Sequence, residues 1–272
     1  METLQTICIA LIQGITEFLP ISSSAHIQFP ALLLGWDDRG LHFDIAIHAG
    51  SLLAVVAYFR RTLAELGIGS LASLKNRSIN VHSELAIKLA LGTLPILFAG
   101  FFLAEFAANE ARHLVVIVAT TLGFGILLGL ADWRTTRLQA RGHIFDDTNP
   151  SYLAAIVIGI AQIFAIVPGT SRSGVTITAA LLLGLSRTQA AKFSFLLAIP
   201  AIMGAFALML LEVGEAAGSF NLVQFVIGFV VAGISAYLCI GFFMTVIEKI
   251  GMWPFVIYRL VIGVLLGCVL WL

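Results

Sequence analysis

The chain has 272 residues and a formal net charge of zero, and 60% of its residues are hydrophobic while only 11% are charged. This composition and a mean hydropathy of +1.03 exclude an ordinary soluble globular protein and indicate a polytopic helical membrane protein, a single transmembrane domain over residues 1–272. Nucleic acid is excluded as a partner, because binding to its phosphate backbone requires a clustered basic surface. Cys8, Cys239 and Cys268 have no disulfide or metal-ligand spacing and are expected to be small buried hydrophobic residues.

The first apolar stretch, Thr3–Leu34, is too long for a single helical crossing and is interrupted near its middle by Pro20 and three serines. Its second leg, His26–Leu34, would reach only about 14 Å at a rise of about 1.5 Å per residue, so it cannot span a bilayer. We expect a re-entrant helical hairpin whose tip stops near the membrane midplane. Irregular backbone is tolerated at that depth only if it is buried in protein or lines a wet cavity.

A second broken stretch, Tyr152–Leu185, follows the same plan, with Pro168 at its break and a second leg, Val175–Leu185, of about 16 Å. Six other stretches contain the roughly 17 to 25 apolar residues of a spanning helix. They are Phe43–Phe59, Leu85–Leu103, Leu114–Ala131, Phe193–Leu211, Leu222–Val246 and Trp253–Leu272. The predicted fold class is all-α, with six transmembrane helices plus two re-entrant helical hairpins.

Basic residues are unevenly divided between the two sides of this predicted layout. Ten fall on one side, namely Arg60, Arg61, Lys75, Arg77, Arg134, Arg137, Arg141, Arg187, Lys192 and Lys249, and two, Arg39 and Arg112, fall on the other. Because Lys and Arg accumulate in cytoplasmic loops, the first hairpin is predicted to enter from the extracytoplasmic side and the second from the cytoplasmic side. The two halves, 1–131 and 151–272, are therefore predicted to be inverted repeats joined by a polar linker, 132–150.

Short matches between the halves favour this duplication. Gly14-Ile-Thr-Glu17 resembles Gly159-Ile-Ala-Gln162, and Pro20 followed three residues later by Ser23 matches Pro168 followed by Ser171. Each match is weak alone, but their common order supports the repeat.

Each broken stretch contains one permanently charged side chain, Glu17 in the first and Arg172 in the second. An ionisable group at membrane depth costs several kcal/mol unless it is paired or hydrated, so such a group indicates a functional site. The opposite signs of these two charges predict that the tips of the two hairpins share one polar pocket.

The second tip has the composition of an anion-binding turn. A turn rich in Pro, Gly and Ser that leads into a helix offers free N–H groups, hydroxyls and the positive end of the helix dipole. Arg172 adds a planar bidentate donor that suits phosphate oxygens. We expect a phosphate group to bind there, with Thr170, Ser171, Ser173 and Gly174 as further contacts.

The first tip has the composition of a cation site. Gln13 and Glu17 are four residues apart and therefore share one face of a helix. A carboxylate and an amide oxygen can hold a divalent hard cation when water and substrate phosphate complete the shell. Ser22, Ser23 and His26 follow at the break. Together the two tips predict a phosphoryl-transfer site.

Four segments of this chain resemble the BacA-type undecaprenyl-pyrophosphate phosphatases, and the resemblance covers nearly the whole chain. The segments are Gln13-Gly-Ile-Thr-Glu17-Phe-Leu-Pro-Ile-Ser-Ser23-Ser-Ala-His26, Pro168-Gly-Thr-Ser-Arg172-Ser-Gly174, Ser194-Phe-Leu-Leu-Ala-Ile-Pro200 and Ile257-Tyr-Arg259. The resemblance implies an enzyme of the bacterial cytoplasmic (inner) membrane that removes one phosphate from undecaprenyl pyrophosphate and so recycles the lipid carrier for peptidoglycan and other envelope polymers. It also implies a link to bacitracin sensitivity, a requirement for Mg²⁺ or Ca²⁺, a pocket that opens to the extracytoplasmic side and, often, a homodimer.

The same resemblance assigns roles to individual residues. The metal motif of the family falls on Gln13 and Glu17, and its active-site serine and histidine fall on Ser23 and His26. With the motif arginine at Arg172, the implied catalytic set is Glu17, Ser23, His26 and Arg172. His48 stands where many members of the family have glutamine, so it is either a second imidazole facing the site or a structural residue.

Several assignments have a structural alternative. Gln13 could cap polar backbone, Ser22 could serve only the turn, and Arg172 could be a purely structural counter-ion. His26 could act as general base, as nucleophile or only as a hydrogen-bond donor. We expect Arg259 to brace the helix bundle rather than to touch substrate.

A different class of function also fits the predicted architecture. Re-entrant hairpins, inverted repeats and half-helix N-termini aimed at an anion are also found in secondary transporters. The alternative to the phosphatase is therefore a flippase or secondary transporter for a lipid phosphate or another anion. Catalytic turnover separates the two hypotheses.

Overall fold

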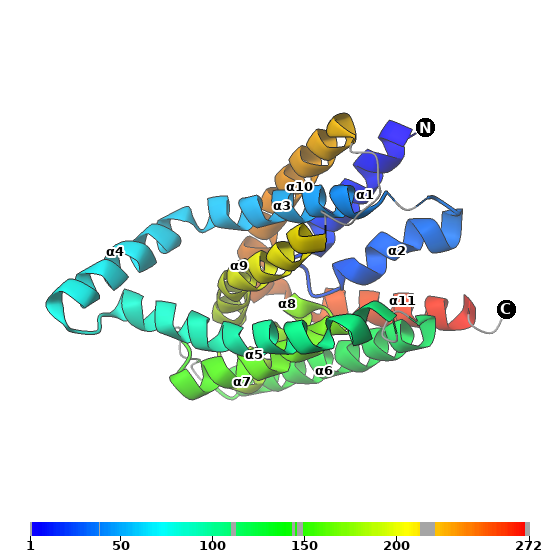
Figure 1. The fold of residues 1–272 in the computed structure, drawn as a ribbon. Helices are drawn as coiled ribbons and strands as arrows, with labels where there is room; N and C mark the ends of the chain where they lie inside the picture. Colours follow the sequence, from blue (N-terminus) through cyan, green and yellow to red (C-terminus); the bar gives the residue numbers. More distant parts are fainter. Residues whose placement is uncertain are drawn as a thin grey trace.

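The fold is known from a computed structural model, which describes residues 2–37, 39–109, 113–142, 145, 149–212 and 221–269. The regular elements within these ranges are all helices (Figure 1). In chain order they are α1 (Glu2–Thr16), α2 (Ser23–Leu34), α3 (Leu41–Tyr58), α4 (Arg60–Asn76), α5 (Val81–Asn109), α6 (Leu114–Ala140), α7 (Tyr152–Gln162), the 3₁₀ helix η2 (Ile163–Ile166), α8 (Arg172–Leu182), α9 (Arg187–Glu212), α10 (Leu222–Ile250) and α11 (Trp253–Val269).

The chain is a multi-pass membrane protein. Five described helices, α3, α5, α6, α9 and α10, are long and apolar enough to cross a bilayer. The sixth predicted span corresponds to α11, which has 17 described residues and reaches about 25 Å, slightly less than a typical hydrocarbon core. Five of the six predicted long helices are thus confirmed, and the crossing by α11 stays a prediction.

Both predicted hairpins are broken where the sequence indicated. The first helix of each ends before a short turn, and the second helix begins after a serine, Ser22 or Ser171, with a positive φ of 74° or 70°. Residues other than glycine rarely adopt this conformation, and it persists only where the surrounding structure enforces it. The equivalent residues are therefore Ser22 and Ser171, whereas the sequence had matched Ser23 with Ser171. The match was wrong by one residue, because the second tip has one more residue between its proline and its helix.

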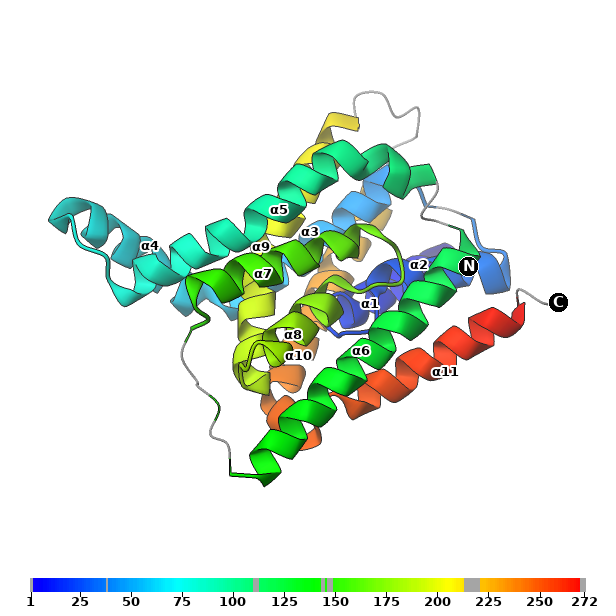
Figure 2. The ribbon, with the colours of Figure 1, turned by 90° about the horizontal axis from the view of Figure 1, so that it is seen from below.

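The first leg of each hairpin packs against a helix from the other half of the chain. A Cβ atom on Gly14 of α1 would lie 2.5 Å from the carbonyl oxygen of Ala232 in α10, and one on Gly159 of α7 would lie 2.3 Å from that of Gly92 in α5. Glycine is thus required at both crossings. The neighbouring helices α6 and α11, which end the two halves, also run along each other (Figure 2). This reciprocal packing favours the prediction of two inverted repeats.

The largest hydrophobic cluster is built around α9 and includes Phe18 of the first tip. Phe18 of the first tip packs edge-on against Phe195 of α9, with ring centroids 5.5 Å apart, and Phe195 contacts Phe243 of α10. All three rings are fully buried. The first tip is therefore held in protein, as the prediction of a re-entrant hairpin requires.

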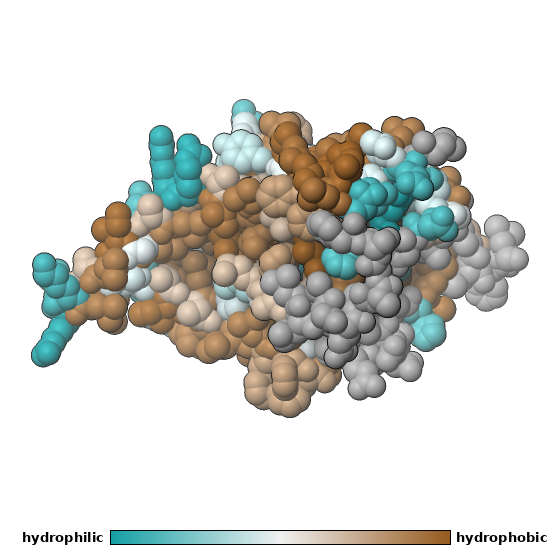
Figure 3. Space-filling model, turned by 45° about the horizontal axis from the view of Figure 1, so that its top comes forward, coloured by the Kyte–Doolittle hydropathy of each residue, from teal (hydrophilic) through white to brown (hydrophobic). Residues whose placement is uncertain are grey.

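Two regions differ from the sequence prediction. Residues 60–76 lie between two predicted spans and were assigned no helix, but they form α4, an amphipathic helix that projects with the start of α5 beyond the bundle (Figure 1). In Figure 3 most of the visible surface is hydrophobic, and many hydrophilic residues gather at this end and at the opposite end. The three cysteines are free, but Cys8 and Cys239 are only half-buried and Cys268 is exposed, so the expectation of buried cysteines was wrong.

Candidate active site

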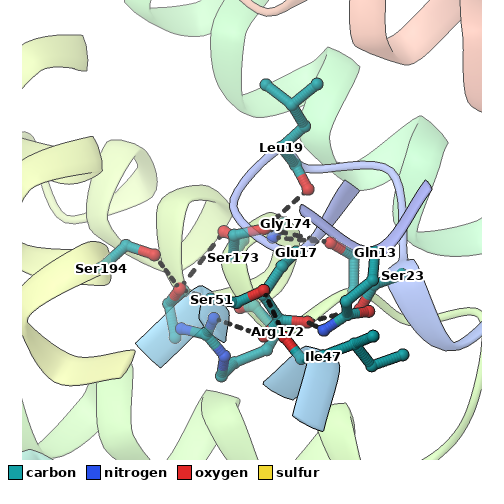
Figure 4. A network of polar contacts seen from close by, with 12 residues as sticks. Gln13, Glu17, Leu19, Ser23, Ile47, Ser51, Arg172, Ser173, Gly174 and Ser194 are labelled. Atoms are coloured by element: carbon teal, nitrogen blue, oxygen red, sulfur yellow. Dashed lines mark hydrogen bonds and ion pairs between the residues drawn. The ribbon is translucent and has the colours of Figure 1, made fainter. Parts of the chain in front are cut away.

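The two tips bring Glu17 and Arg172 together. Nη2 of Arg172 donates to Oε1 of Glu17 over 3.1 Å, although the residues are 155 positions apart in the sequence (Figure 4). Arg172 is the first residue of α8, and Glu17 directly follows α1. The structure thus places a carboxylate from one tip and a guanidinium from the other in a single polar site.

The second carboxylate oxygen of Glu17 is also engaged. Oε2 accepts hydrogen bonds from the Ser23 hydroxyl at 2.7 Å and from Nε2 of Gln13 at 3.0 Å. Ser23 is the first residue of α2, so the start of each second leg contacts the same carboxylate. A serine hydroxyl that donates to a buried carboxylate has its proton acceptor already in place.

A pocket of about 420 Å³ opens beside this carboxylate. Its polar lining consists of Glu17, Ser22, Ser23, Ser24, His48, Ser171 and Arg172. The remaining lining is apolar and comes from α5, η2 and α9. This division suits a ligand with an anionic head and a hydrocarbon tail.

Several buried polar atoms of the tips have no hydrogen-bond partner among the described residues. They include Nη1 of Arg172, a free donor, and Oε1 of Gln13, a free acceptor. Buried polar groups in native proteins are nearly always paired, so unpaired ones at a pocket indicate a ligand, an ion or water. Nη1 of Arg172 is thus a donor available to an anion at the pocket, while Oε1 of Gln13, which lies outside the pocket lining, is an acceptor next to Glu17.

The donor set is compatible with a hydrated divalent cation. No group of three His, Cys, Asp or Glu side chains that could hold a metal is found within the described ranges. The available oxygens are the carboxylate of Glu17 and the free Oε1 of Gln13, which leaves most of a coordination shell to water and phosphate. Mg²⁺ commonly binds in this way, with few protein ligands.

His26 lies apart from the pocket lining. Its Nδ1 contacts the carbonyl oxygen of Ser22 at 2.6 Å, and its Nε2 contacts the hydroxyl of Tyr258 at 2.7 Å. Both ring nitrogens are thus engaged by the protein. Of the four predicted catalytic residues, Glu17, Ser23 and Arg172 meet at the pocket, whereas His26 packs beside α11.

Comparisons with known proteins show the family of this chain. The family model described as "Bacitracin resistance protein BacA" matches residues 6–265. The chain belongs to this BacA family. A curated relative from Marinobacter nauticus, named undecaprenyl-diphosphatase, is 46% identical over 270 residues, which is 99% of this chain and 100% of the relative.

Within this BacA-family site, Arg259 ties the two tips together, as expected for a bracing residue. The side chain is 1% exposed, and it donates hydrogen bonds only to peptide carbonyl oxygens. The acceptors are those of Pro20 in the first tip, Gly169 and Thr170 in the second, and Thr120 and Thr121 in α6. These five bonds match the five N–H donors of a guanidinium.

The other predicted binding residues differ in their positions. Ser171 and Ser22 line the pocket, and His48 lines it with its Nδ1 bonded to the carbonyl oxygen of Asp44 at 2.8 Å. Gln13, Thr170, Ser173 and Gly174 are absent from the lining. Instead, the Ser173 hydroxyl donates to the carbonyl oxygen of Leu19 at 2.8 Å, and the Gly174 N–H donates to the Ser171 hydroxyl at 3.1 Å. In this structure these residues join and shape the tips, and their contact with substrate stays a prediction.

Sequence reasoning missed Tyr258 and undervalued Gln162. Tyr258 holds His26, and its only signal was its place beside Arg259 in the matched segment. Gln162 is fully buried, and neither atom of its amide has a partner in the described structure. Its signal was its alignment with Glu17 in the repeat.

Proposed function

We propose that this chain hydrolyses undecaprenyl pyrophosphate to undecaprenyl phosphate and inorganic phosphate, and so recycles the lipid carrier for peptidoglycan and other envelope polymers. One observation carries the proposal: Ser23 and Arg172 share the carboxylate of Glu17 at the polar part of an otherwise apolar pocket. Membership of the family and the name of the relative from Marinobacter nauticus support it.

The geometry favours Ser23 as the nucleophile. Its oxygen attacks the terminal phosphorus while its proton passes to Oε2 of Glu17, which lies 2.7 Å away. The phosphoanhydride bond breaks, and undecaprenyl phosphate leaves as an anion that needs no proton. Glu17 then releases this proton to solvent. Water attacks the phosphoserine and gives a proton to Glu17, which passes it to the Ser23 oxygen as the bond between that oxygen and phosphorus breaks and phosphate departs.

Arg172 stabilises the charge that develops in these steps. Its Nη2 is hydrogen-bonded to Glu17, but its Nη1 has no partner among the described residues and can donate to a phosphoryl oxygen. Preorganised donors of this kind contribute about 2.7–4 kcal/mol each where they have been removed from other active sites. We also propose that Glu17 and Oε1 of Gln13 hold a divalent cation, Mg²⁺ or Ca²⁺, which when bound would neutralise phosphate charge.

The pocket is proposed to open to the extracytoplasmic side of the bacterial inner membrane. It is lined by the later parts of α5 and α9, including Gly100 and Leu208, whereas basic residues are concentrated near the first residues of these helices and in α4. Because basic residues mark the cytoplasmic side, the opening lies toward the other side. A homodimer stays a prediction.

The decisive experiment compares Ser23→Ala with His26→Asn in purified protein. Phosphate release from undecaprenyl pyrophosphate is measured at saturating Mg²⁺, and Ser24→Ala serves as the control because Ser24 lines the pocket without contacting Glu17. We expect Ser23→Ala to lower kcat by about a thousandfold or more, His26→Asn to have a smaller effect, and Ser24→Ala to retain most activity. Near-normal turnover by Ser23→Ala would exclude the serine as nucleophile.

The transporter alternative is not favoured by the family or by the named relative. It also gives no reason for a serine hydroxyl to be hydrogen-bonded to a buried carboxylate. Absence of phosphate release from the folded wild-type protein, together with movement of lipid phosphate across sealed vesicles, would reverse this preference.

A further inference from the structure

Gln162, the last residue of α7, is a fully buried amide without a hydrogen-bond partner. Neither Nε2 nor Oε1 is paired in the part of the chain that the structure describes, and the residue is 0% exposed. The other unpaired buried side-chain atoms belong to Gln13, Thr170 and Arg172 of the two tips and to Arg39. An orphaned amide within a protein interior destabilises the fold, so its presence requires an explanation.

The position of Gln162 along α7 places it next to the pocket. α5 and α7 run in the same direction, because Lys88 lies over the ring of Tyr152 at 5.0 Å and Gly92 contacts Gly159 further along both helices. One turn beyond Gly92, Ile96 lines the pocket.

The chain that follows Gln162 also reaches the pocket. Three and four residues after Gln162, Ala165 and Ile166 of η2 line the pocket. Residues at this spacing share one face of a helix. Gln162 itself is absent from the lining, and its backbone position is about one helical turn before this part of the pocket wall.

Gln162 holds the place in the second hairpin that Glu17 holds in the first. Each lies three residues after the glycine that packs against the other half, and each lies where the first leg ends. The Glu17 carboxylate receives three side-chain hydrogen bonds, whereas the side-chain amide of Gln162 receives and donates none that involve the described residues. An uncharged amide at this position can donate to a phosphate that a second carboxylate would repel.

We propose that Gln162 is a substrate-binding residue whose Nε2 donates to a phosphoryl oxygen of the pyrophosphate head. This inference rests on the proposed function, because it takes its ligand from that reaction. A permanently bound water is a weaker explanation, since such a water needs two to four polar partners and the nearby pocket-lining residues, Ile96, Ala165 and Ile166, are apolar. A pyrophosphate head that enters the pocket brings its own oxygen acceptors.

The test is the substitution Gln162→Met, which keeps the size of the side chain and removes both unpaired polar atoms. In ligand-free detergent-purified protein, we expect the Tm of this variant to equal or exceed that of the wild type. With farnesyl pyrophosphate as the probe, we expect KM to rise about tenfold or more, because one hydrogen bond to a charged group is lost. Gln162→Glu should raise KM further by repulsion.

Gln139→Met provides the matched control, because the amide of Gln139 is fully paired between Arg187 and Glu248. It should lower the Tm and leave KM unchanged. The proposal is overturned if Gln162→Met lowers the ligand-free Tm, which would show a permanent partner such as water, or if its KM equals that of the wild type.

A second readout separates this proposal from the proposed function. Inorganic pyrophosphate should raise the Tm of the wild type, and this rise should shrink in Gln162→Met. If the wild type releases no phosphate, the proposed function fails, while the pyrophosphate-induced Tm shift still reports on Gln162. An equal shift in both proteins would overturn the role assigned to Gln162.

Discussion

Glu17 is bonded by three side chains that come from three different helices or their ends. Gln13 lies on α1, Ser23 begins α2 and Arg172 begins α8. A buried carboxylate is costly unless it is paired and hydrogen-bonded, and two of the three groups that compensate it here, Ser23 and Arg172, line the pocket. The residue is therefore both the structural centre of the two tips and the nearest base to the Ser23 hydroxyl.

His26 is supported by Tyr258 rather than directed at the pocket, and this contact gives a test at the residue scale. Tyr258→Phe removes one hydrogen bond to Nε2 of His26 and little else. We expect kcat to fall by less than about tenfold, since a single neutral hydrogen bond contributes about 0.5–1.5 kcal/mol.

The measurement for Tyr258→Phe is phosphate release as a function of pH. If His26 were the general base, losing the tyrosine hydroxyl would shift the pH profile of kcat and reduce it strongly. A pH profile unchanged from that of the wild type supports the structural role of His26.

The contact between Glu17 and Arg172 could be predicted from the sequence. Each is a lone charge in an apolar stretch, and opposite charges at membrane depth commonly pair. The separation of His26 from the pocket could not be predicted. Ser23 and His26 are only three residues apart, but the turn of α2 between them directs His26 toward Tyr258, 232 positions along the chain. Such a contact depends on tertiary packing that local spacing does not encode.

At the scale of elements, α11 acts as a clamp on the tips of both hairpins. Arg259 reaches carbonyl oxygens of Pro20, Gly169 and Thr170, and the second tip approaches it closely enough that a Cβ on Gly174 would lie 3.1 Å from its Nη1. Since the tips lack regular backbone hydrogen bonds, this guanidinium supplies donors that the turns themselves do not.

Replacing Arg259 should loosen both tips at once. Arg259→Gln leaves several buried carbonyl oxygens without a donor, at about 1–3 kcal/mol each, so we expect the Tm to fall by about 10 °C or more. Because the tips carry the pocket, KM for the lipid pyrophosphate should also rise. Arg259→Lys restores a charge and some donors and should recover part of both losses.

The control for this clamp is Arg134→Gln on α6. Arg134 is exposed and donates a single hydrogen bond to a carbonyl oxygen at the end of α8. The Tm and KM of the Arg134→Gln variant should stay close to those of the wild type. An Arg259→Gln variant as stable as Arg134→Gln would contradict the clamp.

The element boundaries also show where the sequence was informative. The hairpin breaks were predicted because Pro and Ser interrupt apolar runs, a local signal. The helix α4 was missed because its composition is mixed and it follows α3 directly. Its basic residues are also typical of a cytoplasmic loop, so they did not indicate a helix. Its helical form is supported by packing against α5 and by Asn80, just before α5, whose side-chain amide donates to the carbonyl oxygen of Gly69 at 2.7 Å.

At the scale of the whole molecule, the two halves exchange contacts. α1 packs on α10 and α7 on α5, so neither hairpin is held mainly by its own half. This exchange explains how residues from two distant segments form one pocket without a dedicated active-site domain. A second buried pair, Arg187 with Asp132 at 2.6 Å, connects α9 with α6 near the end of the molecule that carries most basic residues.

The central claim is that Glu17 and Arg172 act as one unit on the pyrophosphate, and a double-mutant cycle measures this directly. Phosphate release is determined for wild type, Glu17→Gln, Arg172→Gln and the double variant, each shown by its Tm to be folded. We expect each single change to lower kcat/KM by about a thousandfold and the double change to cost little more than the worse single one. If the two losses multiply in full, the residues act independently and the account of a shared site is contradicted.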